Sequence, residues 1–306
     1  MKQTSAFITI IGRPNVGKSS LMNKILGQKV AIVSDKPQTT RTKIMGIKTS
    51  GENQLVFIDT PGFHRARNEL DKNMNKAVSD GMSDVDAAVL VVEANPKFGF
   101  DGDNLPPAEI ELITELKKRK LKAVLVINKI DLLEKKEELL TLITAYTKAF
   151  EFATVIPLSA KTGDGVDILL DELKKFSKPS VHYFPDDDVT DQPEKVMVAE
   201  MIREKLLRTL DKEVPHGIAV DLERFFERDT VEGEPIVEVE ATIICEKESH
   251  KGIIIGKSGS MLKRIGTMAR RDIEEFFGIK ATVKLWVKVK EDWRNRQGLI
   301  HTFGLD

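Results

Sequence analysis

The segment Gly12–Ser19 reads GRPNVGKS and matches the pattern G-x-x-x-x-G-K-[ST]. It follows an apolar run and opens an amphipathic stretch, so backbone N–H groups and a helix N-terminus can form a cradle for phosphate oxygens. In such a cradle Lys18 places a positive charge at the β- and γ-phosphates, and the Ser19 hydroxyl binds Mg²⁺. The loop therefore predicts a nucleoside triphosphate site with contacts from Asn15, Val16, Gly17, Lys18, Ser19 and Ser20.

A second segment, Asp59-Thr60-Pro61-Gly62, ends the apolar run QLVFID. A carboxylate at Asp59 can hold Mg²⁺ through water, and the Gly62 N–H can bond a γ-phosphate. The tetrapeptide alone would be an ordinary turn. Because it follows the phosphate loop along the chain, it predicts a group that senses the third phosphate.

The choice of base falls to Asn128-Lys129-Ile130-Asp131, which follows the apolar run AVLVIN. A carboxylate at Asp131 can accept two hydrogen bonds from guanine N1–H and N2–H₂, whereas adenine would leave the charge unpaired. Asn128 either contacts guanine O6/N7 or ties neighbouring loops together. Ser159-Ala160-Lys161 can offer a backbone N–H to guanine O6. These groups predict a guanine nucleotide.

Alternating strands and helices must position these residues. Apolar runs predict strands at 7–11, 43–48, 54–58, 87–92, 123–127 and 154–157, and amphipathic patterns predict helices near 17–26, 67–80, 107–119, 134–149 and 165–176. This alternation is typical of an α/β fold with a mostly parallel, doubly wound sheet. Its binding groups lie at the carboxyl ends of the strands.

The C-terminal part has a different rhythm and a different charge. A helix is expected near 195–210, strands near 217–226, 235–246 and 281–290, and two helices around the loop Gly256-Lys257-Ser258-Gly259. Residues 194–246 contain 7 Lys/Arg and 14 Asp/Glu, whereas residues 247–298 contain 13 and 6. A net charge of −1 thus conceals a basic segment, which favours a polyanion as partner.

The loop G-K-S-G between two helices resembles the G-x-x-G loop of KH domains, and the element order resembles the type II, bacterial arrangement, an α+β fold. In KH domains this loop clamps the backbone of about four nucleotides beside an apolar groove. The resemblance implies RNA contacts from Ile254, Ile255, Gly256, Lys257, Ser258, Gly259, Lys263, Arg264, Arg270 and Lys288.

Size and composition fit two domains. With 306 residues, we expect a nucleotide-binding domain at 1–178, a linker at 179–194 rich in proline and acidic residues, and an RNA-binding domain at 195–306. A single cysteine, Cys245, excludes an internal disulfide framework. No run approaches the ~20 apolar residues of a membrane span. We expect a cytoplasmic monomer, with peripheral contact at the inner face of the cell membrane left open.

Taken together, GRPNVGKS, DTPG, NKID and SAK resemble the translation-factor-related class of small GTPases, and the whole chain is similar to its Era branch. That resemblance implies hydrolysis of GTP to GDP, binding near the 3′ end of 16S ribosomal RNA, and a role in assembling the 30S subunit. It also implies that a threonine of Pro37-Gln38-Thr39-Thr40-Arg41 binds Mg²⁺. We assign Thr40, with Thr39 as the alternative.

Hydrolysis in this family would engage Lys18, Thr40, Gly62 and Asn15. Phe63 stands where Ras-like proteins place a water-orienting glutamine, and a phenyl ring cannot hydrogen-bond water. Asn15 resembles the asparagine with which related GTPases hold K⁺ beside the phosphates. His64 is expected to be a surface residue.

Two other functions remain open from the sequence. The chain could be a constitutive RNA-binding scaffold in which the nucleotide only stabilises the fold. It could also be a membrane-associated regulatory GTPase whose basic segment meets anionic lipid.

Overall fold

The computed structural model describes residues 3–95, 105–135, 137–211 and 214–305, which fold into two compact units. The first unit comprises Met1–Ala31, Thr40–Arg67 and Asp71–Asp191. The second unit comprises Gln192–Asp306 together with two short segments from earlier in the chain, Ile32–Thr39 and Asn68–Leu70. The chain therefore enters the second unit twice before its main part begins.

A seven-stranded sheet forms the centre of the first unit, in the order β2-β3-β1-β4-β5-β6 with β7 paired to β1. All pairs from β3 to β6 are parallel, whereas β2 and β7 are antiparallel to their neighbours. The strands are β1 (Thr4–Ile11), β2 (Ile44–Ser50), β3 (Asn53–Asp59), β4 (Ala87–Glu93), β5 (Ala123–Asn128), β6 (Thr154–Pro157) and β7 (Lys178–Pro179).

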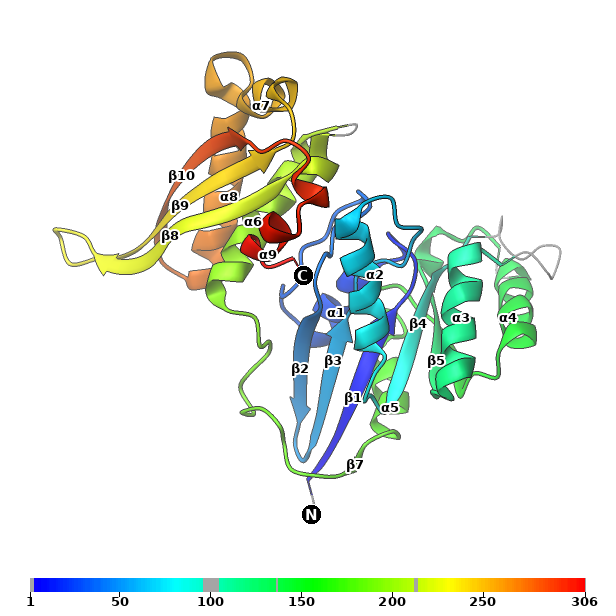
Figure 1. Ribbon diagram of the computed structural model, residues 1–306. Coiled ribbons are helices and arrows are strands. Elements are labelled where there is room, and N and C mark those ends of the chain that lie inside the picture. The colour runs from blue at the N-terminus through cyan, green and yellow to red at the C-terminus, as the bar shows by residue number, and fades with distance from the viewer. Residues whose placement is uncertain (1–2, 96–104, 136, 212–213, 306) are drawn as a thin grey trace. The chain divides into compact units, whose positions relative to one another are not determined.

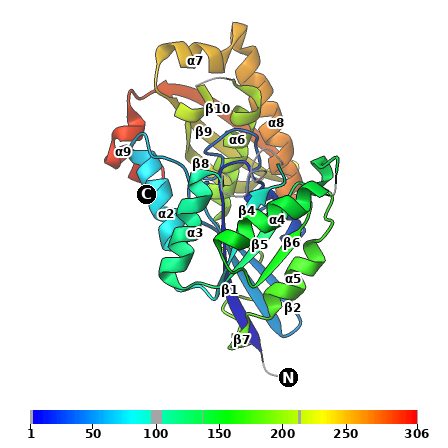
Figure 2. The same cartoon turned by 90° about the vertical axis from the view of Figure 1, so that its right-hand side faces the viewer.

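Helices cover both faces of this sheet. Figure 1 shows α2 and α3 in front of the sheet and α1 and α5 behind it, and in Figure 2 helices α3, α4 and α5 face the viewer. The helices are α1 (Lys18–Leu26), α2 (Glu69–Gly81), α3 (Pro107–Arg119), α4 (Glu137–Ala149) and α5 (Val166–Lys174), with a 3₁₀ turn at Ile130–Leu132. The predicted doubly wound α/β fold is confirmed.

The central strands have the composition that this position requires. Every residue of β5 is buried, and in β4 only Glu93 at the end is partly exposed. Strands covered on both faces cannot alternate polar and apolar residues, since neither face meets water. On one face, apolar residues of β1, β4 and β5 pack with those of α2, α3 and α4.

Residues 178–191 are bound to the first sheet. β7 pairs with β1, the Gln54 side chain bonds the backbone of Tyr183 and Phe184, and Thr190 bridges Gly46 of β2. The proline-rich segment therefore lies along the sheet up to Asp191. The predicted linker limits of 179–194 stay a prediction.

The second unit has a three-stranded sheet in the order β10-β9-β8, with β9 antiparallel to β8 and parallel to β10. Its core consists of apolar residues from the sheet and from α6, α7 and α8. Its elements are α6 (Glu194–Thr209), β8 (Ala219–Asp229), β9 (Pro235–Cys245), α7 (Glu248–Ile255), α8 (Ser260–Phe277), β10 (Lys280–Val289) and α9 (Gln297–Thr302). The predicted helix-strand-strand-helix-helix-strand order of a type II KH domain is confirmed.

Candidate nucleotide site and nucleic-acid interface

The phosphate loop lies between β1 and α1, at the carboxyl edge of the first sheet. Its lysine is 6% exposed, and Nζ donates to the carbonyls of Gly12 at 3.1 Å and Arg13 at 3.0 Å. The loop backbone needs residues that tolerate positive φ, and Asn15 (65°) and Gly17 (98°) supply them. The ammonium of Lys18 is therefore held inside the loop, where a phosphate oxygen would be bound.

Gly17 also makes room for the base-recognition segment. A Cβ atom on Gly17 would lie 2.3 Å from the Asn128 Nδ2 atom. That nitrogen donates to the Val16 carbonyl at 2.8 Å, and Asn128 Oδ1 accepts from the Ala160 N–H at 2.9 Å. Of the two roles the sequence left open for Asn128, the structure shows the tie between three loops. The Ala160 amide, expected at guanine O6, here bonds Asn128.

Three predicted metal ligands come together. Ser19 Oγ donates to Asp59 Oδ2 at 2.6 Å, and it lies 2.9 Å from Thr40 Oγ1. Thr39 is used elsewhere, because its hydroxyl donates to the Lys36 carbonyl at 2.6 Å. The structure thus favours Thr40 over Thr39 as the threonine beside Ser19.

The chemistry of this group fits Mg²⁺. Asp59 Oδ1 is buried and has no hydrogen-bond partner, which is costly unless a cation or its water satisfies it. Burial raises the pKa of the Asp59 carboxyl to about 6, and Lys18 and Ser19 offset this only in part. Burial likewise lowers the pKa of the Lys18 ammonium to about 8. Hard oxygen ligands of this kind suit Mg²⁺.

Gly62 lies directly against the phosphate loop. A Cβ atom there would be 2.7 Å from the Cα atom of Pro14, so no side chain fits without displacement. The next residue, Phe63, donates its N–H to the Gly12 carbonyl at 3.2 Å and packs its ring on the apolar core beneath the helices. The phenyl ring therefore has a packing role in place of a water-orienting one.

The residues predicted to recognise guanine lie at the ends of β5 and β6. Ser159 Oγ donates to Asp131 Oδ1 at 2.6 Å, which orients the carboxylate on its 3₁₀ turn. Lys129 adopts a left-handed backbone conformation and its Nζ lies 3.2 Å from Glu93 Oε1. Lys161 is exposed. The predicted residues of NKID and SAK thus line one edge.

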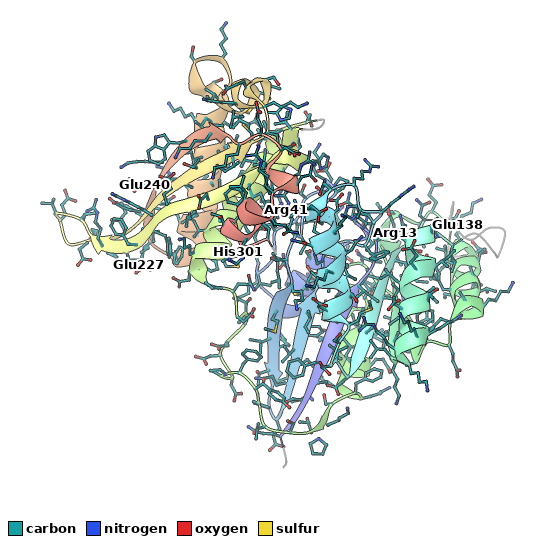
Figure 3. The ribbon with its side chains drawn as sticks, in the orientation of Figure 1. Arg13, Arg41, Glu138, Glu227, Glu240 and His301 are labelled. Atoms are coloured by element: carbon teal, nitrogen blue, oxygen red, sulfur yellow. The ribbon has the colours of Figure 1, made fainter. Side chains whose placement is uncertain are left out.

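Sequence reasoning missed a buried polar group behind the phosphate loop. Glu109 of α3 is fully buried, and its Oε1 lies 2.5 Å from Arg13 Nε while Oε2 accepts a bond from the Tyr146 hydroxyl. Figure 3 shows Arg13 beside α3. Burial raises the pKa of Glu109. The sequence signal for this group was a carboxylate on the apolar, buried face of an amphipathic helix.

A second group that the sequence did not reveal lies within the second unit. Helix α6 holds the segment Ile32–Thr39, which precedes Thr40 in the chain. The Val33 N–H donates to the fully buried Glu204 at 3.0 Å. Arg208 donates to the Val33 carbonyl at 2.9 Å, and Arg203 donates to the Thr39 carbonyl. Lys205 then joins Glu204 at 3.0 Å and also pairs with Asp272 of α8. Polar bonds therefore run from this segment to α8.

The GKSG loop lies between α7 and α8 of the second unit. Gly256 has φ of 72°, and a Cβ atom on it would approach the Met261 Cβ at 2.6 Å. Ser258 has a left-handed conformation with φ of 51°, and Gly259 precedes α8 with φ of 78°. Lys257 and Ser258 are exposed. The loop presents backbone, the short Ser258 side chain and the positive charge of Lys257 to solvent, which suits close approach of a phosphate chain.

A groove of about 680 Å³ extends from this loop between α8 and the edge strand β10. Its rim carries Lys263 and Arg270, and its floor includes Val283 and Leu285. Gly266 of α8 also lines the groove, across from Leu285 of β10. Apolar floor and basic rim together suit a single-stranded nucleic acid.

Several predicted RNA contacts lie elsewhere. Ile254 is fully buried in the core, which leaves no surface for RNA, so we assign it a packing role. Lys288 is on the outward side of β10, where its Nζ lies 3.2 Å from Glu223 Oε1, as Lys284 pairs with Glu240, labelled in Figure 3. The even-numbered lysines point away from the groove because side chains alternate along a strand. Arg264 is exposed, and Ile255 is partly buried.

Two further features were sought in the described ranges: membrane-spanning helices, and metal-binding groups made of His, Cys, Asp and Glu alone. None of their helices has the length and apolar character needed to cross a membrane. Within the same ranges, no three His, Cys, Asp or Glu residues form a group that could hold a metal ion.

Family profiles match both units. A profile described as "50S ribosome-binding GTPase" matches residues 7–129, and one described as "KH domain" matches residues 213–294. Curated relatives match over nearly the full length. GTPase Era of Clostridioides difficile is 46% identical over 300 residues, covering 98% of each chain. GTPase Era of Ruminiclostridium cellulolyticum is 46% identical over 304 residues, covering 99% of this chain and 98% of that protein.

Solved structures agree. A crystal structure of Era in complex with MgGDPNP and nucleotides 1506–1542 of 16S ribosomal RNA has a TM-score of 0.92 and 32% identity, covering 99% of both chains. A variant of Aquifex aeolicus Era bound to GDP and AlF₄⁻ has a TM-score of 0.91 and 32% identity, covering 100% of this chain and 99% of that one. The protein therefore belongs to the Era family of GTPases, with a P-loop GTPase domain followed by a KH domain.

Proposed function

We propose that this GTPase is a switch that binds the 3′ region of 16S ribosomal RNA in its KH groove and assists assembly of the 30S subunit. The observation that carries the proposal is the likeness, over 99% of both chains, to Era in complex with MgGDPNP and nucleotides 1506–1542 of 16S ribosomal RNA. The groove between α8 and β10, with Lys263 and Arg270 on its rim, supplies a surface of matching chemistry.

In the nucleotide site, Lys18 and the loop backbone bind the β- and γ-phosphates, and Asp131 reads guanine. Ser19, Thr40 and Asp59 would hold Mg²⁺, directly or through water, and the cation would supply positive charge beside the phosphates. The contact of Ser19 with both Thr40 and Asp59 supports this assignment, as does the unbonded, buried Asp59 Oδ1 atom. The Gly62 N–H completes the site at the γ-phosphate.

We further propose K⁺ beside the phosphates, held by Asn15. Phe63 cannot orient water, so the transition-state charge must be stabilised by another group. Asn15 projects from the phosphate loop in a left-handed conformation, and an amide oxygen is a suitable ligand for a hard cation.

The segment Ile32–Thr39 transmits the change between the GTP and GDP states to the RNA groove. This segment packs in the second unit, whereas its covalent neighbour Thr40 lies beside Ser19 in the first unit. Loss of the γ-phosphate releases Thr40, as in other GTPase switches. Glu204 and Lys205 link the segment to α8, which borders the groove. The segment and its bonds are therefore a second connection between the nucleotide site and the second unit, in addition to the linker.

The test measures binding of the purified protein with GDPNP to an RNA of the 16S 3′ region and to a shuffled RNA of equal length. We expect the 3′-region RNA to bind at least tenfold more tightly. Equal affinity for the two RNAs would leave only a general RNA binder.

Parallel arms separate the alternatives. Co-sedimentation with 30S precursors but not with 50S particles would support the small-subunit role. Binding to 50S particles would instead agree with the description of the matching family profile. Binding to anionic vesicles with no RNA preference would favour the membrane-associated GTPase. A cytoplasmic, monomeric state is part of the proposal, and fractionation and light scattering test it.

A further inference from the structure

His64 has a defined structural position in the loop after Gly62. Its side chain is 24% exposed, its Nδ1 lies 3.0 Å from the Gly62 carbonyl oxygen, and its Nε2 lies 3.3 Å from Asp71 Oδ1. Asp71 is itself buried, and its Oδ2 accepts the Arg67 N–H at 2.8 Å. The His64 carbonyl accepts a bond from Asn75 at 2.7 Å. The ring thus bonds the Gly62 carbonyl and lies beside the Asp71 carboxylate, and the His64 main chain is bonded to Asn75 of helix α2.

The contact matters because of the peptide group that it holds. The peptide between Gly62 and Phe63 has its N–H on the Gly12 carbonyl at 3.2 Å and its C=O on His64 at 3.0 Å. Gly62 has no side chain to restrict it, so its backbone would otherwise sample many conformations. With both ends of the following peptide bonded, Gly62 is kept against Pro14 of the phosphate loop.

We propose that His64, held by Asp71, is a positioning residue for GTP hydrolysis that fixes Gly62 where the γ-phosphate binds. The proposal rests on the role of Gly62 given above. It explains how a loop whose Phe63 cannot orient water is still ordered for the reaction. His64 acts through the backbone of Gly62 and selects for the triphosphate, since GDP has no γ-phosphate for Gly62 to meet.

The protonation state of His64 follows from the same geometry. An N–H at Nδ1 can donate to the Gly62 carbonyl in either protonation state. The 3.3 Å contact of Nε2 with Asp71 Oδ1 lacks hydrogen-bond geometry and is an ion pair only when the ring is protonated. The neighbouring Asp71 carboxylate raises the pKa of His64, and the Gly62 carbonyl adds to this, while burial and Arg67 oppose it. The charged groups facing the ring are Asp71 on α2 and Arg67 on the loop. The double contact is therefore complete below this raised pKa and is lost as pH rises through it.

The experiment compares His64→Ala with Arg65→Ala, an exposed neighbour in the same loop, as the matched control. Affinities for GDP and GDPNP and the rate of GTP hydrolysis are measured on the full chain with Mg²⁺. We expect His64→Ala to lower the GDPNP-to-GDP affinity ratio and kcat by about fivefold each, the size of one ordinary hydrogen bond, with GDP affinity unchanged. Arg65→Ala should change neither.

Asp71→Asn supplies a second, independent readout. Asparagine keeps the oxygen that accepts the Arg67 N–H and can donate to a neutral imidazole, which then donates to Gly62. The wild type should lose GDPNP preference as pH rises through the His64 pKa, whereas Asp71→Asn should show a flat profile.

Three results would overturn the proposal: equal weakening of GDP and GDPNP in His64→Ala, an unchanged or increased ratio, or the same pH profile in wild type and Asp71→Asn. Failure of the proposed Gly62 role gives a different result. In that case the wild type itself would show no preference for GDPNP over GDP that depends on the γ-phosphate.

Discussion

The nucleotide site and the RNA groove are built in different ways. At the nucleotide site, polar atoms of the protein bond one another: Ser19 bonds Asp59, Asn128 ties three loops, and Ser159 orients Asp131. In the groove, glycines and an apolar floor give the shape, while Lys257 and Lys263 extend into solvent. One site selects by directed hydrogen bonds, and the other by shape and charge.

This difference predicts how each region responds to substitution. Directed, buried bonds concentrate binding energy in single residues, because an unpaired buried group costs its full desolvation. Charge contacts in solvent are weaker, spread over several residues and reduced by salt. Single changes should therefore be large at the nucleotide and small in the groove.

The largest expected effect is at Asp131. Asp131→Asn should weaken GTP binding by more than about 100-fold, since two hydrogen bonds to a charged acceptor are worth about 1.5–3 kcal/mol each. Ser159 can still donate to the asparagine oxygen, so the loop should keep its fold. Xanthosine triphosphate should bind the variant better than GTP does, because its 2-oxo group accepts from the new amide. Fluorescence titration measures both, and unchanged GTP affinity would remove the guanine assignment.

A double change in the GKSG loop should come next. Lys257→Asp with Ser258→Asp places two negative charges where a phosphate backbone must approach, which should cost at least ~2 kcal/mol, more than tenfold in RNA affinity. Aspartate tolerates the left-handed backbone of Ser258, so the loop should remain intact.

GTP binding and basal hydrolysis serve as the control for this variant. Both should persist, because the phosphate and base contacts lie in the first unit. The loop is not the RNA clamp if the variant keeps wild-type affinity and wild-type salt dependence.

A matched pair of lysines tests the geometry of the groove. Lys263→Ala should weaken RNA binding by about fivefold and reduce the salt slope by about 1, as expected for one phosphate contact. Lys288→Ala should stay within about twofold, since that lysine pairs with Glu223 on the outward face of the sheet. RNA titrations at two salt concentrations decide between them. A larger loss in Lys288→Ala would show that the RNA follows the other face.

The smallest expected effect concerns the cation. Replacing K⁺ by Na⁺ should slow hydrolysis by about threefold if Asn15 holds the ion, roughly 0.6 kcal/mol, and Asn15→Ala should remove the difference. Phosphate release is measured in both salts on the same preparations. Equal wild-type rates would exclude K⁺ and leave the GTPase assignment unaffected.

The sequence predicted most of the fold because its signals are local. Strands such as AAVLVV must be buried on both sides, and GRPNVGKS places its own loop between a strand and a helix. Ser19 and Asp59 lie together, as expected where a motif determines the backbone, whereas the burial of Ile254 and the outward position of Lys288 could not be predicted. The side that a residue faces depends on tertiary packing, which composition does not show.

The contacts of α6 with residues 32–39 could not be predicted either. They join positions about 170 residues apart, and Glu204 looks like one charge among many on a helix until its burial is known. The position of His64 could not be predicted for a similar reason, because its neighbour Asp71 is buried only once α2 has packed.

The central claim is that the nucleotide state sets the affinity of the groove for RNA. Titration of a 16S 3′-region RNA into the wild type with GDPNP or with GDP tests it most directly, alongside Glu204→Gln, which alters the carboxylate between Val33 and Lys205. We predict at least fivefold tighter binding with GDPNP in the wild type, a coupling of about 1 kcal/mol, and a smaller difference in the variant. Equal RNA affinity in the two nucleotide states of the wild type would contradict the account.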